Sequence, residues 1–233
     1  MIASKNTASP WSKTAAAAKA NLLPGLALQT FALAVVLAYY FHPGTHDLLN
    51  QLADFKNRLG YRYSIIATSI CGGVIPSLYL ILNPNTRKDT PYSHIWFYVI
   101  FWAYKGFEVD LLYRAQGWMF GVEPTLGVIV GKVMVDQVLY NPIWAAPLGL
   151  FVFHWKESGF HISSLLDLDK LDFLRRNMPM GLLATWIIWL PAVAIIYSLP
   201  AALQIPLFNI VLCFFSLLYI SLTRKKNQAG TSS

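Results

Sequence analysis

GVIVGKVMVDQVLYNPIW, residues 127–144, is the stretch that decides how this chain folds, because it places charges inside an apolar segment. The segment is typical of a membrane helix, yet it contains Lys132, Asp136 and Gln137. A charged side chain at the centre of a membrane helix costs about 2.5–3.5 kcal/mol on insertion scales. Lys132 and Asp136 are four residues apart, so an α-helix would bring them together as an ion pair. We therefore predict that this polar face is turned into a helix bundle.

The roughly opposite face of the same segment carries small residues. Gly127 and Gly131 have the Gly-xxx-Gly spacing that lets the backbone of another helix approach closely. Pro142 predicts a kink, because a membrane helix tolerates proline only where neighbouring groups satisfy the freed backbone. We therefore expect neighbouring helices on both sides of this segment.

The composition of the chain indicates an all-α, polytopic transmembrane helix bundle. Of the 233 residues 56% are hydrophobic and only 12% are charged, about half the charged share of a typical soluble domain. The net charge of +7 comes from basic tails and loops, as retention on one side of a membrane requires, so we expect a lipid bilayer and no nucleic acid as partner. A soluble protein with a very apolar core is the alternative, which several runs of near-spanning length disfavour.

We expect one transmembrane domain, residues 22–223, between a basic N-terminal tail (1–21) and a basic, disordered C-terminal tail (224–233). It contains about six hydrophobic segments: 22–41, 63–82, 95–119, 125–153, 182–199 and 207–222. Apolar residues at helical spacing within 42–62 predict an amphipathic helix on the membrane surface. The last two segments are short and separated by prolines, so one broken or re-entrant element is an alternative. Six crossings with both termini on one side would place most basic residues on that side, as the positive-inside rule favours.

The segment 95–119 carries a second group of charges. Lys105 with Glu108, and Asp110 with Arg114, have the spacing of ion pairs on a helix. Arg114 has the alternative of extending to the membrane surface. The candidate residues for a pore or a polar core are therefore Lys132, Asp136, Gln137, Lys105, Glu108, Asp110 and Arg114.

The sequence carries no signature of an enzyme or a metal protein. It lacks a Gly-x-Ser-x-Gly elbow, a Gly-rich phosphate loop and zinc-type Cys/His spacing. The carboxylates of Glu108 and Asp110 have no nucleophile or metal ligand at a suitable spacing. We therefore expect no catalytic residue, metal site or cofactor. Cys71 and Cys213 lie in apolar runs, and we interpret them as packing residues without a disulfide.

Two blocks of the sequence resemble the Mpv-seventeen family, which includes the small peroxisomal membrane proteins. The first is Lys132-xxx-Asp136-Gln137-xxxx-Pro142, and the second begins as Trp186-Ile-Ile-Trp189-Leu-Pro191, with Tyr197, Pro200 and Tyr219-Ile-Ser221 after it. The resemblance covers about residues 61–222, so 22–41 is an additional helix. The family's polar positions after Trp-Pro, and an Arg after the second Pro, are missing here. The chain thus resembles a remote member.

The resemblance implies a multi-helix integral membrane protein. In a eukaryote its place would be an organelle, in the mitochondrial inner or the peroxisomal membrane, and in a bacterium the plasma membrane. Family members are described as non-selective channels or as proteins that affect metabolite and nucleotide supply. A homo-oligomer is compatible with either description.

Three functions follow from these observations. The first is a channel or transporter for small solutes or ions, with a path lined by the Lys132/Asp136 face and with Lys105 or Glu108 opposite. The second is a structural scaffold whose charges only hold the bundle together, and the third, less favoured, is a membrane-embedded lipid enzyme. Trp186 and Trp189 are expected to be interfacial anchors or packing residues rather than ligand contacts.

Overall fold

The structure is a computed structural model that describes residues 10–83 and 92–230, and all regular structure in these ranges is helical. The all-α prediction is therefore confirmed for the described residues. The elements are α1 (Pro10–Phe41), α2 (Pro43–Leu59), α3 (Tyr61–Thr68), the π-helix η1 (Ser69–Val74), α4 (Ile75–Leu82), α6 (Tyr92–Phe120), α7 (Leu126–Met134), the π-helix η2 (Val135–Ala145), α8 (Ala146–Glu157), α9 (Ser163–Leu166), α10 (Lys170–Tyr197) and α11 (Ala201–Gly230).

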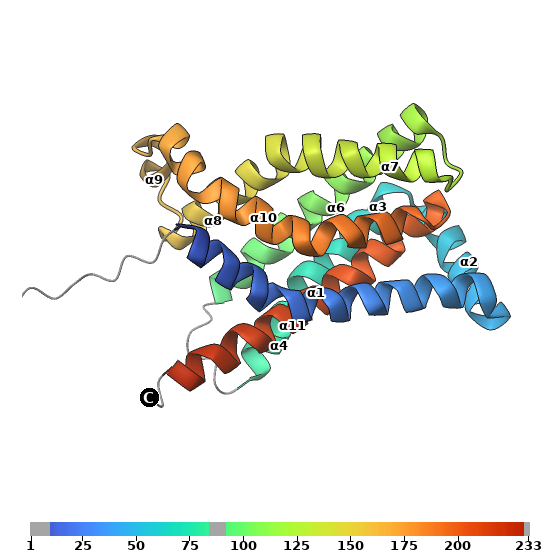
Figure 1. Cartoon of the computed structure of the whole chain (residues 1–233), viewed down its shortest axis with the longest axis horizontal. Helices are drawn as coiled ribbons and strands as arrows, with labels where there is room; N and C mark the ends of the chain where they lie inside the picture. Colours follow the sequence, from blue (N-terminus) through green and yellow to red (C-terminus); the bar gives the residue numbers. More distant parts are fainter. Residues whose placement is uncertain (1–9, 84–91, 231–233) are drawn as a thin grey trace, which may run out of the picture.

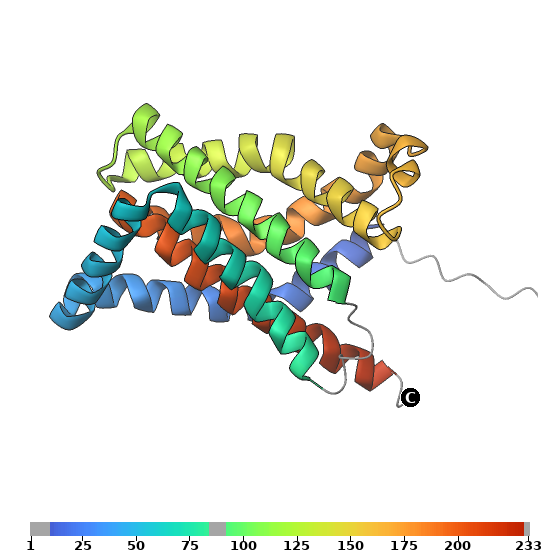
Figure 2. The same cartoon turned by 180° about the vertical axis from the view of Figure 1, so that it is seen from behind.

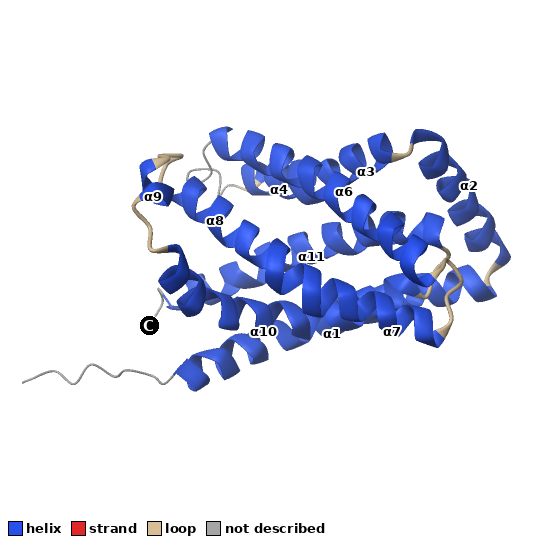
Figure 3. Cartoon of the chain, turned by 90° about the horizontal axis from the view of Figure 1, so that it is seen from above, coloured by secondary structure: helices blue, strands red, loops and turns tan. Residues whose placement is uncertain are grey.

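The longer elements join into rods that run back and forth along one axis (Figures 1 and 2). Within the described ranges these rods are α1, α3–η1–α4, α6, α7–η2–α8, α10 and α11. The short helix α2 and the turns α6–α7 and α10–α11 lie at one end, here called the α2 end. The short helix α9 and both ends of the described chain lie at the other, the α9 end, as Figure 3 also shows. The buried apolar core is formed mainly by α1, α10 and α11.

Length and composition alone identify one stretch, Tyr61–Leu82, as long and apolar enough to cross a membrane. The number rises to three if each of two bent pairs is one span: Gly25–Phe41 with Pro43–Leu59, bent by 102°, and Lys170–Leu183 with Thr185–Tyr197, bent by 51°. Within the described residues this measure therefore does not reach the six hydrophobic segments expected from the sequence. One reason is that α6 carries four charged residues near its middle, and another is that Ala201–Leu217 is a shorter apolar helix.

Two boundaries differ from the sequence-based expectation. Helix α1 begins at Pro10, so the expected tail is helical from that residue, and α11 continues to Gly230, so 224–230 is helical rather than disordered. Residues 1–9 and 231–233 of the two tails lie outside the described ranges. The last two apolar runs lie in two successive helices, α10 and α11, and α10 itself is bent by 51° between Leu183 and Thr185. Pro200 stands just before α11, where its missing N–H breaks no helical hydrogen bond.

Helix α6 crosses α3–η1 at glycines on both partners. A Cβ on Gly106 would collide with the backbone carbonyl of Ser64, and one on Gly73 would lie 2.9 Å from the carbonyl oxygen of Tyr98. The two backbones are therefore in contact, which is how small residues pack membrane helices.

Pro191 removes one hydrogen bond from α10, and another helix replaces it. In an α-helix residue 191 would donate to the carbonyl of Ile187, which proline is unable to do. Gln29 of α1 donates its Nε2 to that oxygen over 3.3 Å. This contact supports the long pairing of α1 with α10.

The outer faces of the rods are apolar, while several charges are inside. Helix α6 exposes Trp96, Ile100, Phe107 and Leu111 at spacings of four and seven residues, which places them on one helix face. The rod α7–η2 exposes Leu126, Val130, Met134 and Val138 in the same way. The buried charged side chains are Lys56, Asp110, Lys132, Asp136 and Lys156.

Candidate functional site

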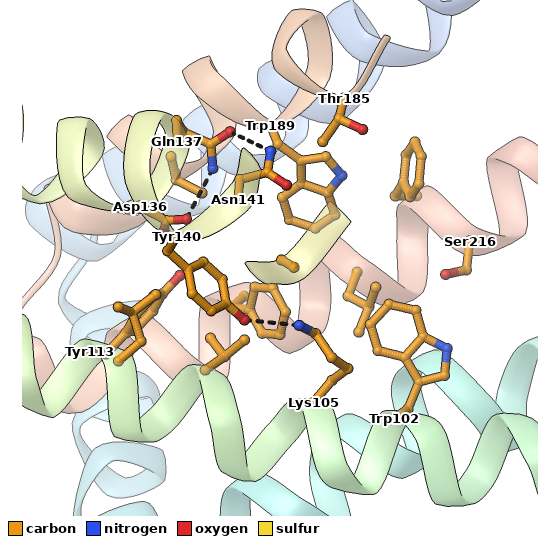
Figure 4. Close-up of a pocket in the computed structure, with 17 residues that line it drawn as sticks. Trp102, Lys105, Tyr113, Asp136, Gln137, Tyr140, Asn141, Thr185, Trp189 and Ser216 are labelled. Atoms are coloured by element: carbon orange, nitrogen blue, oxygen red, sulfur yellow. Dashed lines mark hydrogen bonds between the residues drawn. The ribbon is translucent and has the colours of Figure 1, made fainter. Parts of the chain in front are cut away.

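A cavity of about 230 Å³ lies inside the bundle between α6, η2, α10 and α11 (Figure 4). Most of its wall is apolar or aromatic. The polar side chains that line it include Lys105 and Tyr113 from α6, Asp136, Gln137, Tyr140 and Asn141 from η2, Thr185 from α10 and Ser216 from α11. An apolar cavity with a few convergent polar groups is the usual form of a small-molecule site.

Lys105 links α6 to η2 at the floor of this cavity. Its Nζ donates to Glu108 Oε1 over 2.5 Å and to the hydroxyl of Tyr140 over 2.8 Å. Tyr140 in turn donates to the same Glu108 oxygen. The carboxylate thus compensates the charge of Lys105, although Glu108 itself does not line the cavity.

Asp136 is held by neutral donors. Its Oδ2 accepts a hydrogen bond from the hydroxyl of Tyr197 over 2.6 Å, and its Oδ1 accepts one from Gln137 Nε2 over 3.1 Å. The side chain of Asn141 extends this row through Gln137 Oε1 at 3.5 Å. Asp136 is 6% exposed and forms no ion pair with any Lys or Arg that the structure describes. It is therefore a buried carboxylate at a cavity wall without a directly paired cation.

The expected ion pair between Lys132 and Asp136 is not formed. Lys132 is 1% exposed, and its Nζ lies 5.8 Å from the centre of the Tyr197 ring rather than on the carboxylate. Four-residue spacing aligns two side chains on an α-helix, but the π-helix that starts at Val135 has wider turns and rotates the following residues. Tyr197 also brings a donor from another rod. Lys132 does not line the cavity, so the predicted Lys132/Asp136 face is not a single face.

Pro142 lies inside the π-helix, and Trp186 compensates for it. In the π-helical pattern residue 142 would donate to the carbonyl of Gln137, five residues earlier. Proline has no N–H, and Trp186 Nε1 of α10 donates to that oxygen over 2.9 Å. The wide helical turns at the cavity wall are thus fixed by an indole from a neighbouring rod. Trp189, one turn away on α10, packs on Phe208 and lines the cavity.

Asp110 forms the second polar cluster, which lies toward the α2 end. It is fully buried and accepts hydrogen bonds from Ser64 Oγ at 2.6 Å and Arg114 Nε at 3.0 Å. Lys56 Nζ of α2 lies 3.6 Å from Asp110 Oδ1. Burial lowers the pKa of the Lys56 ammonium, and the attraction of Asp110 opposes this shift. Arg114 also lies over the ring of Tyr61 and remains partly exposed.

The two glycines of the opening stretch do not pack a helix backbone. A Cβ on Gly131 would lie 3.0 Å from the ring of Phe120, whereas one on Gly127 would meet no atom within 4 Å. The Gly-xxx-Gly expectation is therefore wrong for this pair, because the facing element at Gly131 is an aromatic side chain and Gly127 faces outward.

Tyr140 and Asn141 line the cavity but were not predicted as site residues from the sequence. A signal was present, because the polar residues at 136, 137, 140 and 141 recur at helical spacing. Lys56 carried no such signal, since its partner Asp110 is 54 positions away in the chain.

In the described part of the chain, no group of three or more His, Cys, Asp or Glu side chains is arranged to hold a metal ion. No family model, curated protein or solved structure matches this chain.

Proposed function

We propose that the whole bundle is embedded in a lipid bilayer, with all six rods crossing it. The distribution of side chains supports this, since the outer faces of α6 and α7–η2 are apolar while Asp110, Lys132 and Asp136 are inside. A soluble protein rarely exposes such continuous apolar faces. Charges within membrane helices face the bundle interior, as they do here. Hydropathy alone undercounts such rods because it scores the buried charges as if they faced lipid.

Within the membrane the protein acts as a channel or transporter for a small solute or ion. The observation that carries this proposal is the cavity at which Lys105, Asp136, Gln137, Tyr140 and Asn141 converge. Polar groups inside a bilayer are costly unless they face water or a partner. A volume of about 230 Å³ suits a small solute, since sites for drug-sized ligands measure about 300–1,000 Å³.

The resemblance to the Mpv-seventeen family is part of the same proposal. The chain is a remote member of that family under this hypothesis, and its membrane is an organelle membrane in a eukaryote or the plasma membrane in a bacterium. The resemblance supports the channel function because family members are described as channels or as affecting metabolite supply.

The Asp110 cluster favours a second candidate function, a structural scaffold. Its carboxylate joins α2, α3 and α6 through Lys56, Ser64 and Arg114. Such a closed cluster holds helices together and needs no solute. The scaffold function predicts that the Asp136 cluster likewise affects only stability.

Flux through pure proteoliposomes separates the two functions. The purified chain is reconstituted, and the permeability of small anions, cations and neutral solutes is measured by conductance and by osmotic swelling. We expect solute-dependent permeability, and we expect Asp136→Asn to shift the anion-to-cation preference towards anions, because it removes a negative charge from the path. Asp172→Asn, an exposed carboxylate paired with Arg176, is the matched control and leaves the preference unchanged. If wild-type protein is permeable to none of these solutes, the result would contradict transport and favour the scaffold function.

A further inference from the structure

The central cavity shares walls with two other cavities of the bundle. Tyr113 lines both the central cavity and a cavity of about 410 Å³ at the α2 end. Trp102, Phe215 and Ser216 line both the central cavity and a third one of about 260 Å³ toward the α9 end. The three spaces are therefore neighbours at these positions.

The three cavities follow one another in the same order along two rods. On α6 they are lined by Tyr98 and Trp102, then by residues from Trp102 to Tyr113, then by residues from Asp110 to Trp118. On α11, which runs in the opposite direction, the same three cavities are lined in turn by residues 215–216, then 208–216, then 201–205. The 20-residue advance from Tyr98 to Trp118 corresponds to about 30 Å of helix, which is the thickness of a bilayer's hydrocarbon core.

We propose that the three cavities are successive chambers of one route through the bundle, and that its α2-end chamber admits small anions. This inference rests on the proposed transport function and adds the course of the path and the class of solute. The ring of Tyr113 divides the α2-end chamber from the central one. It packs 5.0 Å from the ring of Tyr197 and 6.5 Å from that of Phe208, centre to centre, so it closes the route in this structure.

The charges of the α2-end chamber select for anions. Lys56, Asp110 and Arg114 all line it. Two cations face one carboxylate, so one positive charge remains uncompensated there. Asp110 is also already engaged by the hydroxyl of Ser64, whereas Arg114 keeps a partly exposed guanidinium. An anionic solute that enters the α2-end chamber, the mouth of the route, therefore encounters a net positive charge.

The rest of the route also carries positive groups. Lys105 lines the central chamber, where its charge is compensated by Glu108 and where Asp136 is the only acidic residue of the described lining. At the far chamber, Lys156 Nζ approaches the hydroxyl of the wall residue Tyr98 at 3.2 Å. A basic group thus lies at or beside each chamber. Among the described carboxylates that line the three chambers, Asp136 is the one that has no directly paired cation.

Thiol labelling tests the route without requiring flux. Single cysteines replace Ala202 in the α2-end chamber or Val193 in the central one, in a chain with Cys71→Ala and Cys213→Ala. Membrane-impermeant anionic and cationic methanethiosulfonate reagents are applied to the reconstituted protein. We expect Ala202→Cys to react faster with the anionic reagent, and we expect Val193→Cys to react slowly with both.

Two further changes test the gate and the charge. Tyr113→Ala should speed the labelling of Val193→Cys severalfold, whereas Tyr113→Phe, which keeps the ring, should leave it slow. If Tyr113→Ala does not yield folded protein, Tyr113→Leu serves the same test. Lys56→Gln should lower the anionic-to-cationic rate ratio at Ala202→Cys severalfold, because the loss of a positive charge slows the anionic reagent and speeds the cationic one. Arg58→Gln, on the exposed side of α2, is the matched control.

The outcomes separate the route from the function. Labelling of Val193→Cys that does not respond to loss of the Tyr113 ring overturns the route, even if the wild-type protein passes solutes. An unchanged rate ratio in Lys56→Gln overturns the anion selectivity of the mouth. Labelling that follows all expectations in a protein that passes no solute supports the connected chambers and overturns transport.

Discussion

Two carboxylates, Asp110 and Asp136, are buried in neighbouring rods, and they differ in the groups that surround them. Asp110 has two cations and a hydroxyl around it, from α2, α3 and α6. Asp136 has only neutral donors, Tyr197 and Gln137, and it faces a cavity. A buried charge that is paired and hydrogen-bonded can join helices, whereas one held by neutral donors keeps its charge available to whatever enters the cavity. Under the proposed transport function, Asp110 is therefore the structural carboxylate and Asp136 the one that a solute meets.

Asp110→Asn should have the largest effect on stability. It removes the charge that compensates Lys56 and Arg114, and breaking a buried ion pair typically costs about 3–5 kcal/mol. Denaturant or thermal unfolding in detergent measures the loss. The exposed pair of Asp172 with Arg176 is the reference, because Asp172→Asn should cost at most about 1 kcal/mol. Equal stability of Asp110→Asn and Asp172→Asn would contradict a structural role for the Asp110 cluster.

Gly106→Ala should destabilise the same region by about 1–3 kcal/mol, the usual cost of overpacking. The added Cβ would collide with the backbone of α3 beside Ser64, which itself binds Asp110. Gly127→Ala is the control, since its Cβ meets nothing and alanine favours a helix by up to about 1 kcal/mol. The yield of monodisperse protein and its melting temperature give the comparison, and a harmless Gly106→Ala would contradict the close crossing.

Trp186→Phe should cost about 1–3 kcal/mol, the price of leaving a buried polar group without its hydrogen bond. The phenyl ring keeps most of the packing but leaves the Gln137 carbonyl beside Pro142 without its donor. A double variant with Pro142→Ala restores a backbone N–H. We therefore expect the loss caused by Trp186→Phe to be smaller in the Pro142→Ala background, and strictly additive losses would rule out the compensation.

Asp136→Asn should have the smallest effect on stability, below that of Asp110→Asn by several kcal/mol. Asparagine still accepts a hydrogen bond from Tyr197, and no directly paired cation is left behind. Unfolding in detergent is compared with ion preference in bilayers for the same preparation. A large loss of stability with unchanged preference would make the two carboxylates alike and favour the scaffold function.

Features that depend on a single helix are predictable from the sequence alone. The all-α class follows from composition. The contacts of Lys105 with Glu108 and of Asp110 with Arg114 follow from three- and four-residue spacing, because an α-helix of known pitch fixes which of its own residues are neighbours.

The partner that each of the other charges meets depends on the tertiary structure and was not predictable from spacing along the chain. Asp136 binds Tyr197, 61 positions away, and Lys56 reaches Asp110 from another helix. These contacts depend on how each rod is rotated and where it crosses its neighbours. The π-helix η2 changes that rotation in the middle of a rod, and this is why Lys132 and Asp136 are not paired although their spacing is that of an α-helical pair.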